Sequence, residues 1–409
     1  MKGRPNNIHA KQLTRRSFVG VGSLAIAAIP ATVTAEEMRT LGAARREYGE
    51  RSQFERAARL FPSASSTPMT GASRSPLQDQ FGIITPSALH FERHHSGVPT
   101  IDPATHELAI HGLVERPQRF TMSLLKRLPS VSRIHFIECG GNAGREHRGN
   151  PGATVQQSHG LVSCSEWTGV RLSRLLAEVG LKPSARWILA EGADASRHAR
   201  SIPLAKALDD VLVAYGQNGE ALRPEQGYPL RLLVPGWEGN VSVKWLHRLH
   251  VIDQPMMTRD EAASYTDLMP DGKARSFSFE MESNSVITSP SGGQQLEGRG
   301  WIEISGLAWS GRGRIEQVDV STDGGRTWGQ AELQAPVLSK AFTRFRLPWR
   351  WDGQEAVLVS RSRDETGYIQ PTREAIVAAR GTKEGPDGFN HYNGMKPWRL
   401  TREGMVTHV

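Results

Sequence analysis

A cysteine that directly follows an apolar strand is the feature that most constrains this chain. The side chains of Ile134–Ile137 are typical of a β-strand, which stops at Cys139, and Gly140–Asn142 then predict a tight turn. Because glycine lacks a Cβ atom, the backbone of this turn can lie close to a bulky group. A thiol held at a strand end can be a nucleophile, half of a disulfide or a ligand for a soft metal.

The second cysteine, Cys164, lies in the apolar run Leu161–Trp167, which indicates packing. Two cysteines in an exported chain also permit a disulfide. Spacing alone therefore leaves two interpretations open, a disulfide or buried-thiol pair and a functional Cys139.

The first 35 residues predict export to the periplasm. Twin arginines at Arg15 and Arg16 precede Phe18, an apolar stretch and the small-residue pattern Val33–Ala35. This order is typical of a Tat-type signal peptide, and the alternative is a short amphipathic helix with a chance Arg-Arg pair. The Tat route carries folded proteins, which suits a protein whose cofactor is inserted in the cytoplasm.

The charge of the chain favours an anionic partner. The formal net charge is +8 and the pI is about 9.7, which supports long-range attraction of an anionic substrate or an acidic protein. The 42 acidic residues are spread among the 50 basic ones, without a basic block interleaved with aromatics, so nucleic acid is disfavoured. No run of eighteen apolar residues appears, and we expect no membrane span.

The composition and the hydrophobic pattern of the sequence change along the chain, and these changes predict its domains. A length of 409 residues fits two or three domains. We expect an arm or linker over 36–80 (partly helical over 36–61), ordered structure from near Phe81, a mixed α/β domain over 81–260, a β-sandwich over 261–380 and a polar tail over 381–409 that lies on the surface.

Within the first domain, strands and short helices alternate, which is typical of mixed α/β structure. Helices are expected at Thr121–Leu128, from Trp167 to Gly180 and at Ser201–Leu208, and a strand is expected at Val241–Leu246. From about Ser283 short strands follow at regular spacing without a convincing helix, which predicts a sandwich.

Several ordered motifs resemble the sulfite oxidase family of molybdopterin enzymes. They are Cys-x-Gly-Asn at 139–142, Arg-x-His at 93–95, Trp-Thr-Gly-Val-Arg-Leu at 167–172, Ala-Tyr-x-x-Asn-Gly at 214–219, Val-Lys-Trp at 243–245 and Ser-x-Asp-Gly-Gly-x-Thr-Trp at 321–328. The resemblance covers about 81–375 and implies an α+β protein, with a sulfite-oxidase-like molybdopterin domain followed by an immunoglobulin-like β-sandwich dimerisation domain. It also implies a homodimer within a heterotetramer.

The resemblance implies a role for particular residues toward a Mo-molybdopterin cofactor. Cys139 would be the metal ligand, Arg93 would face the substrate oxyanion, Tyr215 would lie beside the metal, and Arg145 would complete the catalytic set. The cofactor-binding residues would be Phe91, Glu92, Arg93, His94, His95, Asp194, Gln226, Arg231, Ser242, Val243 and Lys244. Taken singly, Arg231, Tyr215 and Lys244 are equally compatible with surface or core positions.

One departure from the family pattern concerns the substrate. Sulfite oxidases usually place two arginines after Cys-x-Gly-Asn, whereas Ala143 and Gly144 stand here and Arg145 comes one place later. Less charge favours a sulfur group attached to a carrier protein over a small sulfur anion. The segments Val162–Trp167 and Gly227–Pro229 also resemble the sulfane dehydrogenases of bacterial thiosulfate oxidation.

The resemblance thus implies an enzyme that oxidises carrier-bound sulfane sulfur by oxygen transfer at molybdenum. No Cys-x-x-Cys-His haem segment is present, so electrons are expected to pass to a separate c-type cytochrome subunit. The alternatives are a sulfite dehydrogenase that acts on free sulfite, a reductase of the same family, and a non-enzymatic exported binding protein in which Cys139 and Cys164 form a disulfide.

Overall fold

The computed structural model describes residues 45–62, 69–269, 271–381 and 390–409. Residues from Arg56 onward form one compact unit, and the chain up to Glu55 is a separate unit. The predicted signal peptide at 1–35 lies outside the described residues. None of the helices in the described ranges is long and apolar enough to cross a membrane.

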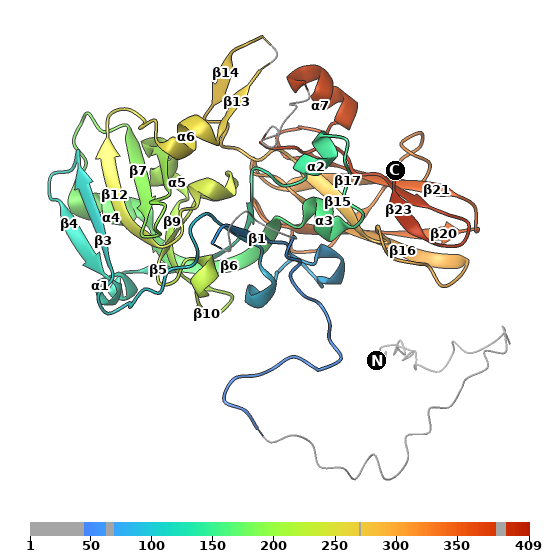
Figure 1. Ribbon diagram of the computed structural model, residues 1–409, viewed down its shortest axis with the longest axis horizontal. Helices are drawn as coiled ribbons and strands as arrows, with labels where there is room; N and C mark the ends of the chain where they lie inside the picture. The colour runs from blue at the N-terminus through green and yellow to red at the C-terminus, as the bar shows by residue number, and fades with distance from the viewer. Residues whose placement is uncertain (1–44, 63–68, 270, 382–389) are drawn as a thin grey trace, which may run out of the picture. The chain divides into compact units, whose positions relative to one another are not determined.

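Two five-stranded sheets form the first part of the compact unit (Figure 1). One has the order β10–β9–β6–β5, with β11 also paired to β9, and the other has the order β4–β3–β12–β7–β8. The strands of the first sheet are β5 (Ser130–Glu138), β6 (Val162–Arg171), β9 (Leu212–Gln217), β10 (Glu220–Ala221) and β11 (Arg231–Leu233). Those of the second are β3 (Glu107–Gly112), β4 (Gln118–Thr121), β7 (Trp187–Gly192), β8 (Ala199–Pro203) and β12 (Leu246–Ile252).

Short helices complete this first core, which is made of Leu, Ile and Val side chains from both sheets. The helices that pack on it are α1 (Met122–Arg127), α4 (Leu172–Val179) and α5 (Leu204–Asp209). The predicted cap of α1 is confirmed, since the Thr121 side chain accepts a hydrogen bond from Leu124 N. Leu172, Leu175, Leu176 and Val179 bury one face of α4.

Three predicted element boundaries in this part are wrong. Trp167 does not begin a helix, because β6 pairs with β5 on one side and β9 on the other as far as Arg171. Ser201 likewise lies in β8, which pairs with β7, so that helix starts at Leu204. The expected strand at 241–246 begins only at Leu246, because Val241 ends a 3-10 helix and Trp245 has a positive φ of 52°, which is incompatible with extended structure.

The second part of the unit is a sandwich of a four-stranded and a five-stranded sheet, as predicted. The four-stranded sheet contains β15 (Asn284–Ser289), β16 (Gly300–Trp309), β20 (Thr343–Trp351) and β19 (Glu332–Leu333). The five-stranded sheet contains β18 (Gly329–Gln330), β17 (Ile315–Ser321), β21 (Ala356–Asp364), β22 (Trp398–Leu400) and β23 (Val406–His408). Their facing side chains form a second core, and Phe136 of β5 and Cys164 of β6 extend into it.

The C-terminal tail is not a surface segment, which corrects the prediction from its polar composition. Trp398 and Leu400 are fully buried, because β22 and β23 complete the edge of the sandwich beside β21. A helix, α7 (Arg373–Arg380), also precedes the tail, although the sequence predicted none in this part.

The N-terminal arm also differs from its prediction. Between residues 45 and 61 none of the described residues is helical. Ordered structure begins before Phe81, because β1 (Gly71–Ser73) pairs with β2 (Glu92–His94) and Leu77 is fully buried. The remaining elements are α2 (Gly144–His147), α3 (Val155–His159), α6 (Arg259–Ala263), β13 (Thr266–Leu268) and β14 (Ala274–Ser276).

Candidate active site

The turn after β5 is held by the side chain of Asn142. Its amide donates to Glu138 Oε1 at 2.8 Å and its carbonyl oxygen accepts from Leu161 N at 3.0 Å. Cys139 N in turn donates to Leu161 O at 3.0 Å. These bonds fix the backbone of Cys139 at the strand end, as the sequence predicted for a presented thiol.

The two cysteines are free and have different surroundings. Cys164 is fully buried in the second core, where burial raises the pKa of its thiol to about 12. Cys139 is partly accessible and lines a pocket. The interpretation that they form a disulfide is therefore wrong, and Cys139 is the cysteine placed for chemistry.

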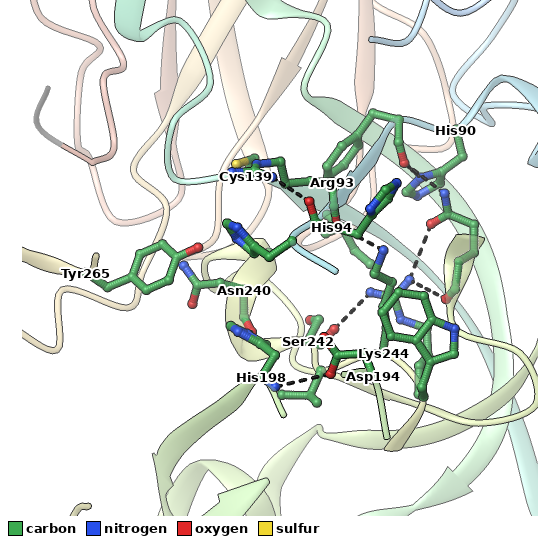
Figure 2. A pocket seen from close by; sticks show the side chains of 18 residues that line it. His90, Arg93, His94, Cys139, Asp194, His198, Asn240, Ser242, Lys244 and Tyr265 are labelled. Carbon is green, nitrogen blue, oxygen red and sulfur yellow. Dashed lines mark hydrogen bonds between the residues drawn. The ribbon is translucent and has the colours of Figure 1, made fainter. Parts of the chain in front are cut away.

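The pocket encloses ≈ 690 Å³, part of it open to solvent, and brings together segments that are far apart in the sequence (Figure 2). The predicted site residues that line it are Phe91, Arg93, His94, His95, Cys139, Asp194, Gln226, Arg231, Ser242, Val243 and Lys244. In Figure 2, Cys139 lies beside Arg93, whereas Lys244 lies beside Asp194 and Ser242. The pocket thus has a thiol end and a cationic end.

The cationic end carries positive charge that is paired with carbonyl oxygens. Lys244 Nζ donates to Arg93 O and Glu225 O, both at 2.9 Å. Arg231 donates to Gln226 O and Ser242 O, both at 3.0 Å. Burial lowers the pKa of Arg231 to about 9, and burial together with the Arg231 charge lowers that of Lys244 to about 7. A bound anion would raise the pKa of both cations, which fits the pterin phosphate.

Asp194 offers an acceptor in the wall of the pocket. Burial alone would raise the pKa of its carboxyl, but hydrogen bonds from Ser196 Oγ, His198 N and Ser96 Oγ outweigh burial and lower it. The carboxylate is therefore ionised and fixed, and can accept hydrogen bonds from a heterocycle.

His90, which the sequence prediction missed, provides a test of whether a cofactor fits. Its Nδ1 bonds Phe91 O at 3.0 Å, while its buried Nε2 has no partner within the described residues. Burial lowers the pKa of His90 to about 3, so the ring is neutral and Nε2 is an acceptor. A buried acceptor in the wall of a pocket needs a donor, and the N–H groups of a pterin supply one. The residues present thus fit the cofactor.

Arg93 and Tyr265 line the same pocket as Cys139. Burial raises the pKa of Cys139, and the charge of Arg93 opposes that shift. Tyr265 lines the same pocket, and burial raises its pKa, so its hydroxyl stays protonated as a donor. The guanidinium of Arg200 lies over the Tyr265 ring at 4.5 Å and supports it from behind.

Three residues proposed from the sequence do not line the pocket. Tyr215 packs against the first core instead, and Tyr265 is a tyrosine that does line the pocket. Arg145 lies on α2, where its Nε bonds Asn150 O at 3.4 Å, because the chain turns at Ala143 with a φ of 54°. Glu92 points to Arg59 at 3.1 Å and to His94 at 3.0 Å.

The residues that sequence reasoning missed are His90, His198, Asn240, Trp245 and Tyr265. Trp245 lies within the recognised Val-Lys-Trp motif and could have been found from it. Tyr265 follows a short helix in a stretch without hydrophobic periodicity, so no local signal marked it.

Comparison with known proteins agrees with this geometry. The oxidoreductase molybdopterin binding domain matches residues 95–259 and the Mo-co oxidoreductase dimerisation domain matches residues 275–386. The crystal structure of the sulfane dehydrogenase SoxCD from Paracoccus pantotrophus is similar, with a TM-score of 0.89 and 44% identity, and the match covers 93% of this chain and 98% of that chain.

Two further relatives are less similar to this chain. The chain is 32% identical over 327 residues to mitochondrial sulfite oxidase of Mus musculus, covering 72% of this chain and 59% of that protein. It is 37% identical over 283 residues to NADH nitrate reductase of Ulva prolifera, covering 60% of this chain and 32% of that protein. The chain therefore spans from about a third to about six-tenths of these relatives. From its pocket and these matches, the chain belongs to the sulfite oxidase family of molybdenum oxidoreductases, whose cofactor is molybdopterin-bound molybdenum.

Proposed function

We propose that this molybdenum oxidoreductase oxidises a sulfane sulfur attached to a carrier protein. The observation that carries the proposal is that no arginine directly follows the Cys139–Asn142 turn. Ala143 and Gly144 follow the Cys139 turn, and Arg145 bonds its own loop. A small free dianion needs several cations to offset its desolvation, whereas a sulfur group on a carrier brings less charge. The 44% identity to a sulfane dehydrogenase also supports this substrate class.

The pocket residues would divide the work between holding the cofactor and handling the substrate. Cys139 would bind the metal as thiolate, and metal charge would offset the burial that raises its pKa. Arg231 and Lys244 would hold the phosphate, and His90 and Asp194 the pterin heterocycle. Bound molybdenum supplies the two-electron redox chemistry and oxygen transfer.

At the substrate side, Arg93 would bind the negatively charged sulfur group and the Tyr265 hydroxyl would donate a hydrogen bond to it. Each oxygen atom added to sulfur comes from one water molecule and releases two protons and two electrons. The electrons would pass singly to a c-type cytochrome subunit. We place the enzyme in the periplasm after Tat export, as a homodimer within a heterotetramer, on the signal sequence and the matched dimerisation domain.

The test combines cofactor analysis with a choice of substrates. Wild-type protein, Cys139→Ser and the matched control Cys164→Ala are analysed for molybdenum and pterin by mass spectrometry. We expect the cofactor in the wild type and in Cys164→Ala, and altered metal coordination or metal loss in Cys139→Ser. Reduction of cytochrome c is then followed with sulfite and with a carrier peptide that bears a cysteine persulfide.

We expect kcat/KM to be about 100-fold higher for the carrier persulfide than for sulfite, because the pocket favours a sulfur group of lower charge over the free dianion. A higher efficiency with free sulfite would instead establish a sulfite dehydrogenase. Absence of molybdenum from the wild type would refute both.

A further inference from the structure

Residues 390 and 391, at the start of the described C-terminal segment, contact the two chain segments that carry Cys139 and Tyr265. His391 N donates to Gly140 O, next to Cys139, at 2.8 Å. The neighbouring Asn390 donates through Nδ2 to Ser264 O at 3.3 Å and to Asp267 Oδ1 at 3.2 Å. These two acceptors lie on either side of Tyr265 in the sequence. Two consecutive tail residues thus bridge the metal-ligand turn and the tyrosine segment.

Gly140 shows how close this approach is. A Cβ atom at this position would lie 3.1 Å from Asn390 Oδ1 and 3.4 Å from Glu238 Oε1. The glycine after Cys139 therefore makes room for the tail.

His391 is fixed on both of its ring nitrogens. Its Nδ1 bonds Glu280 O at 3.1 Å and its Nε2 bonds the carboxylate of Glu238. Both partners are hydrogen-bond acceptors, so both ring nitrogens must carry a proton and the ring is an imidazolium. Burial alone would lower the pKa of His391, but the pairing with Glu238 raises it. With 3% of His391 and 1% of Glu238 exposed, the pair is shielded from solvent.

A second connection runs from this ion pair to the tyrosine ring. Glu238 Oε2 accepts from Asn240 at 2.9 Å and lies 3.4 Å from Arg200 NH1. Arg200 is held by Glu261 at 2.8 Å and covers the Tyr265 ring. The imidazolium is therefore linked to Tyr265 through buried charges as well as through Asn390.

We propose that Asn390 and His391 are positioning residues that set the place of Tyr265 relative to Cys139. The proposal rests on the function proposed above, in which the metal is bound through Cys139 and the substrate contacts the Tyr265 hydroxyl. A displacement of about 1 Å between reacting groups can reduce turnover by about 100-fold, so such a bridge controls rate without touching substrate. The residues lie beyond the 275–386 segment that the dimerisation domain matches.

The test uses full-length holoenzyme with His391→Asn and Asn390→Ala. His391 has a positive φ of 64°, which asparagine tolerates, so His391→Asn removes the imidazolium and leaves the backbone unstrained. Asn390→Ala removes two hydrogen bonds of a part-buried amide, and serves if the unpaired Glu238 prevents His391→Asn from folding. Arg399→Ala, at an exposed position of β22 in the same tail, is the control.

Five quantities are measured: molybdenum per chain, Tm, kcat, KM, and the EPR spectrum of molybdenum(V) produced with dithionite. We expect molybdenum content close to wild type in both variants, and a Tm close to wild type in Asn390→Ala but lower in His391→Asn, which leaves Glu238 without its buried partner. In both variants we expect an altered EPR spectrum and a kcat lower by about 10- to 100-fold with little change in KM. Arg399→Ala should match the wild type in all of them.

Unchanged EPR spectra and kcat in both variants would overturn the proposal. A loss of activity in Asn390→Ala that simply follows lost molybdenum or lowered Tm would also overturn it, since the tail would then be structural only. Because dithionite replaces the substrate, the EPR comparison stays readable even if neither sulfur substrate is turned over, an outcome that counts against the proposed function alone.

Discussion

At the scale of single residues, Tyr215 and Tyr265 show that a motif typical of the family does not by itself mark a position in the pocket. Tyr215 lies in a motif that resembles the family, yet its ring packs against the first core. Tyr265 lies in no recognisable motif, yet it lines the pocket with Cys139 and Arg93. Pocket access, and not motif membership, distinguishes the two phenols.

Replacing each tyrosine by phenylalanine tests this distinction. Tyr265→Phe should lower kcat by about 100-fold, because the hydrogen-bond donor that we propose for the substrate sulfur group is lost. The ring stays under Arg200 at 4.5 Å, so Tm should not change. Tyr215→Phe should leave kcat unchanged in the same cytochrome c assay. Equal losses in the two variants would contradict the assignment.

At the scale of secondary-structure elements, the most consequential strand is β22 in the tail. Its three residues pair with β21 and β23 and bring Trp398 into the second core. Trp398 Nε1 donates to Ile287 O at 3.2 Å, and Lys396 Nζ lies over its ring at 4.6 Å. The strand therefore anchors the segment that carries Asn390 and His391.

Truncation of Trp398 should destabilise the protein strongly. Trp398→Ala removes a fully buried ring, and we expect the free energy of unfolding to fall by about 3–5 kcal/mol. The measurement is urea denaturation followed by circular dichroism. Arg399→Ala, the neighbouring exposed position, should change it by less than about 0.5 kcal/mol. A small effect of Trp398→Ala would mean that the tail packs independently of the sandwich.

At the scale of the whole compact unit, buried and part-buried polar contacts join the molybdopterin domain to the sandwich. Trp309 Nε1 of β16 donates to Glu138 Oε2 at the end of β5, at 2.7 Å. Lys340 Nζ bonds Asp210 Oδ2, next to α5, at 2.6 Å. The strand that presents Cys139 is thus braced from the sandwich as well as from its own sheet.

The ion pairs of Asp210 with Lys206 and Lys340 predict a pH-dependent contribution to stability. Burial alone would raise the pKa of Asp210, but Lys206 and Lys340 lower it below 3.8. Its contribution is therefore complete above pH 3.8 and is lost as pH falls through the lower pKa of the folded state. Asp210→Asn should lower the free energy of unfolding by about 1 kcal/mol at pH 7, because a part-buried ion pair contributes little more than this.

The measurement is the unfolding free energy of both proteins between pH 7 and pH 3. The difference should shrink at the acid end, and Asp209→Asn serves as the neighbouring control. A difference that stays constant down to pH 3 would show that the charge of Asp210 does not act through these pairs.

The sequence alone determined the features that depend on short-range chemistry. Cys139 at a strand end, the Thr121 cap and the alternating strands of the sandwich follow from side-chain type and spacing within a few residues. The motif resemblance extended this to Arg93, Arg231 and Lys244, which do line the pocket.

Only the tertiary structure decided which of these segments meet. The extension of β6 past Trp167, the return of the tail and the position of Tyr265 each depend on partners far away in the chain. The same residues in isolation have no preference for these arrangements. The bridge from Gly140 to His391 joins positions 251 residues apart (391 − 140), and such a contact forms only when the two cores are packed. The hydrophobic pattern of either segment cannot predict this contact, because the free energy that favours the contact comes from burial shared between distant segments.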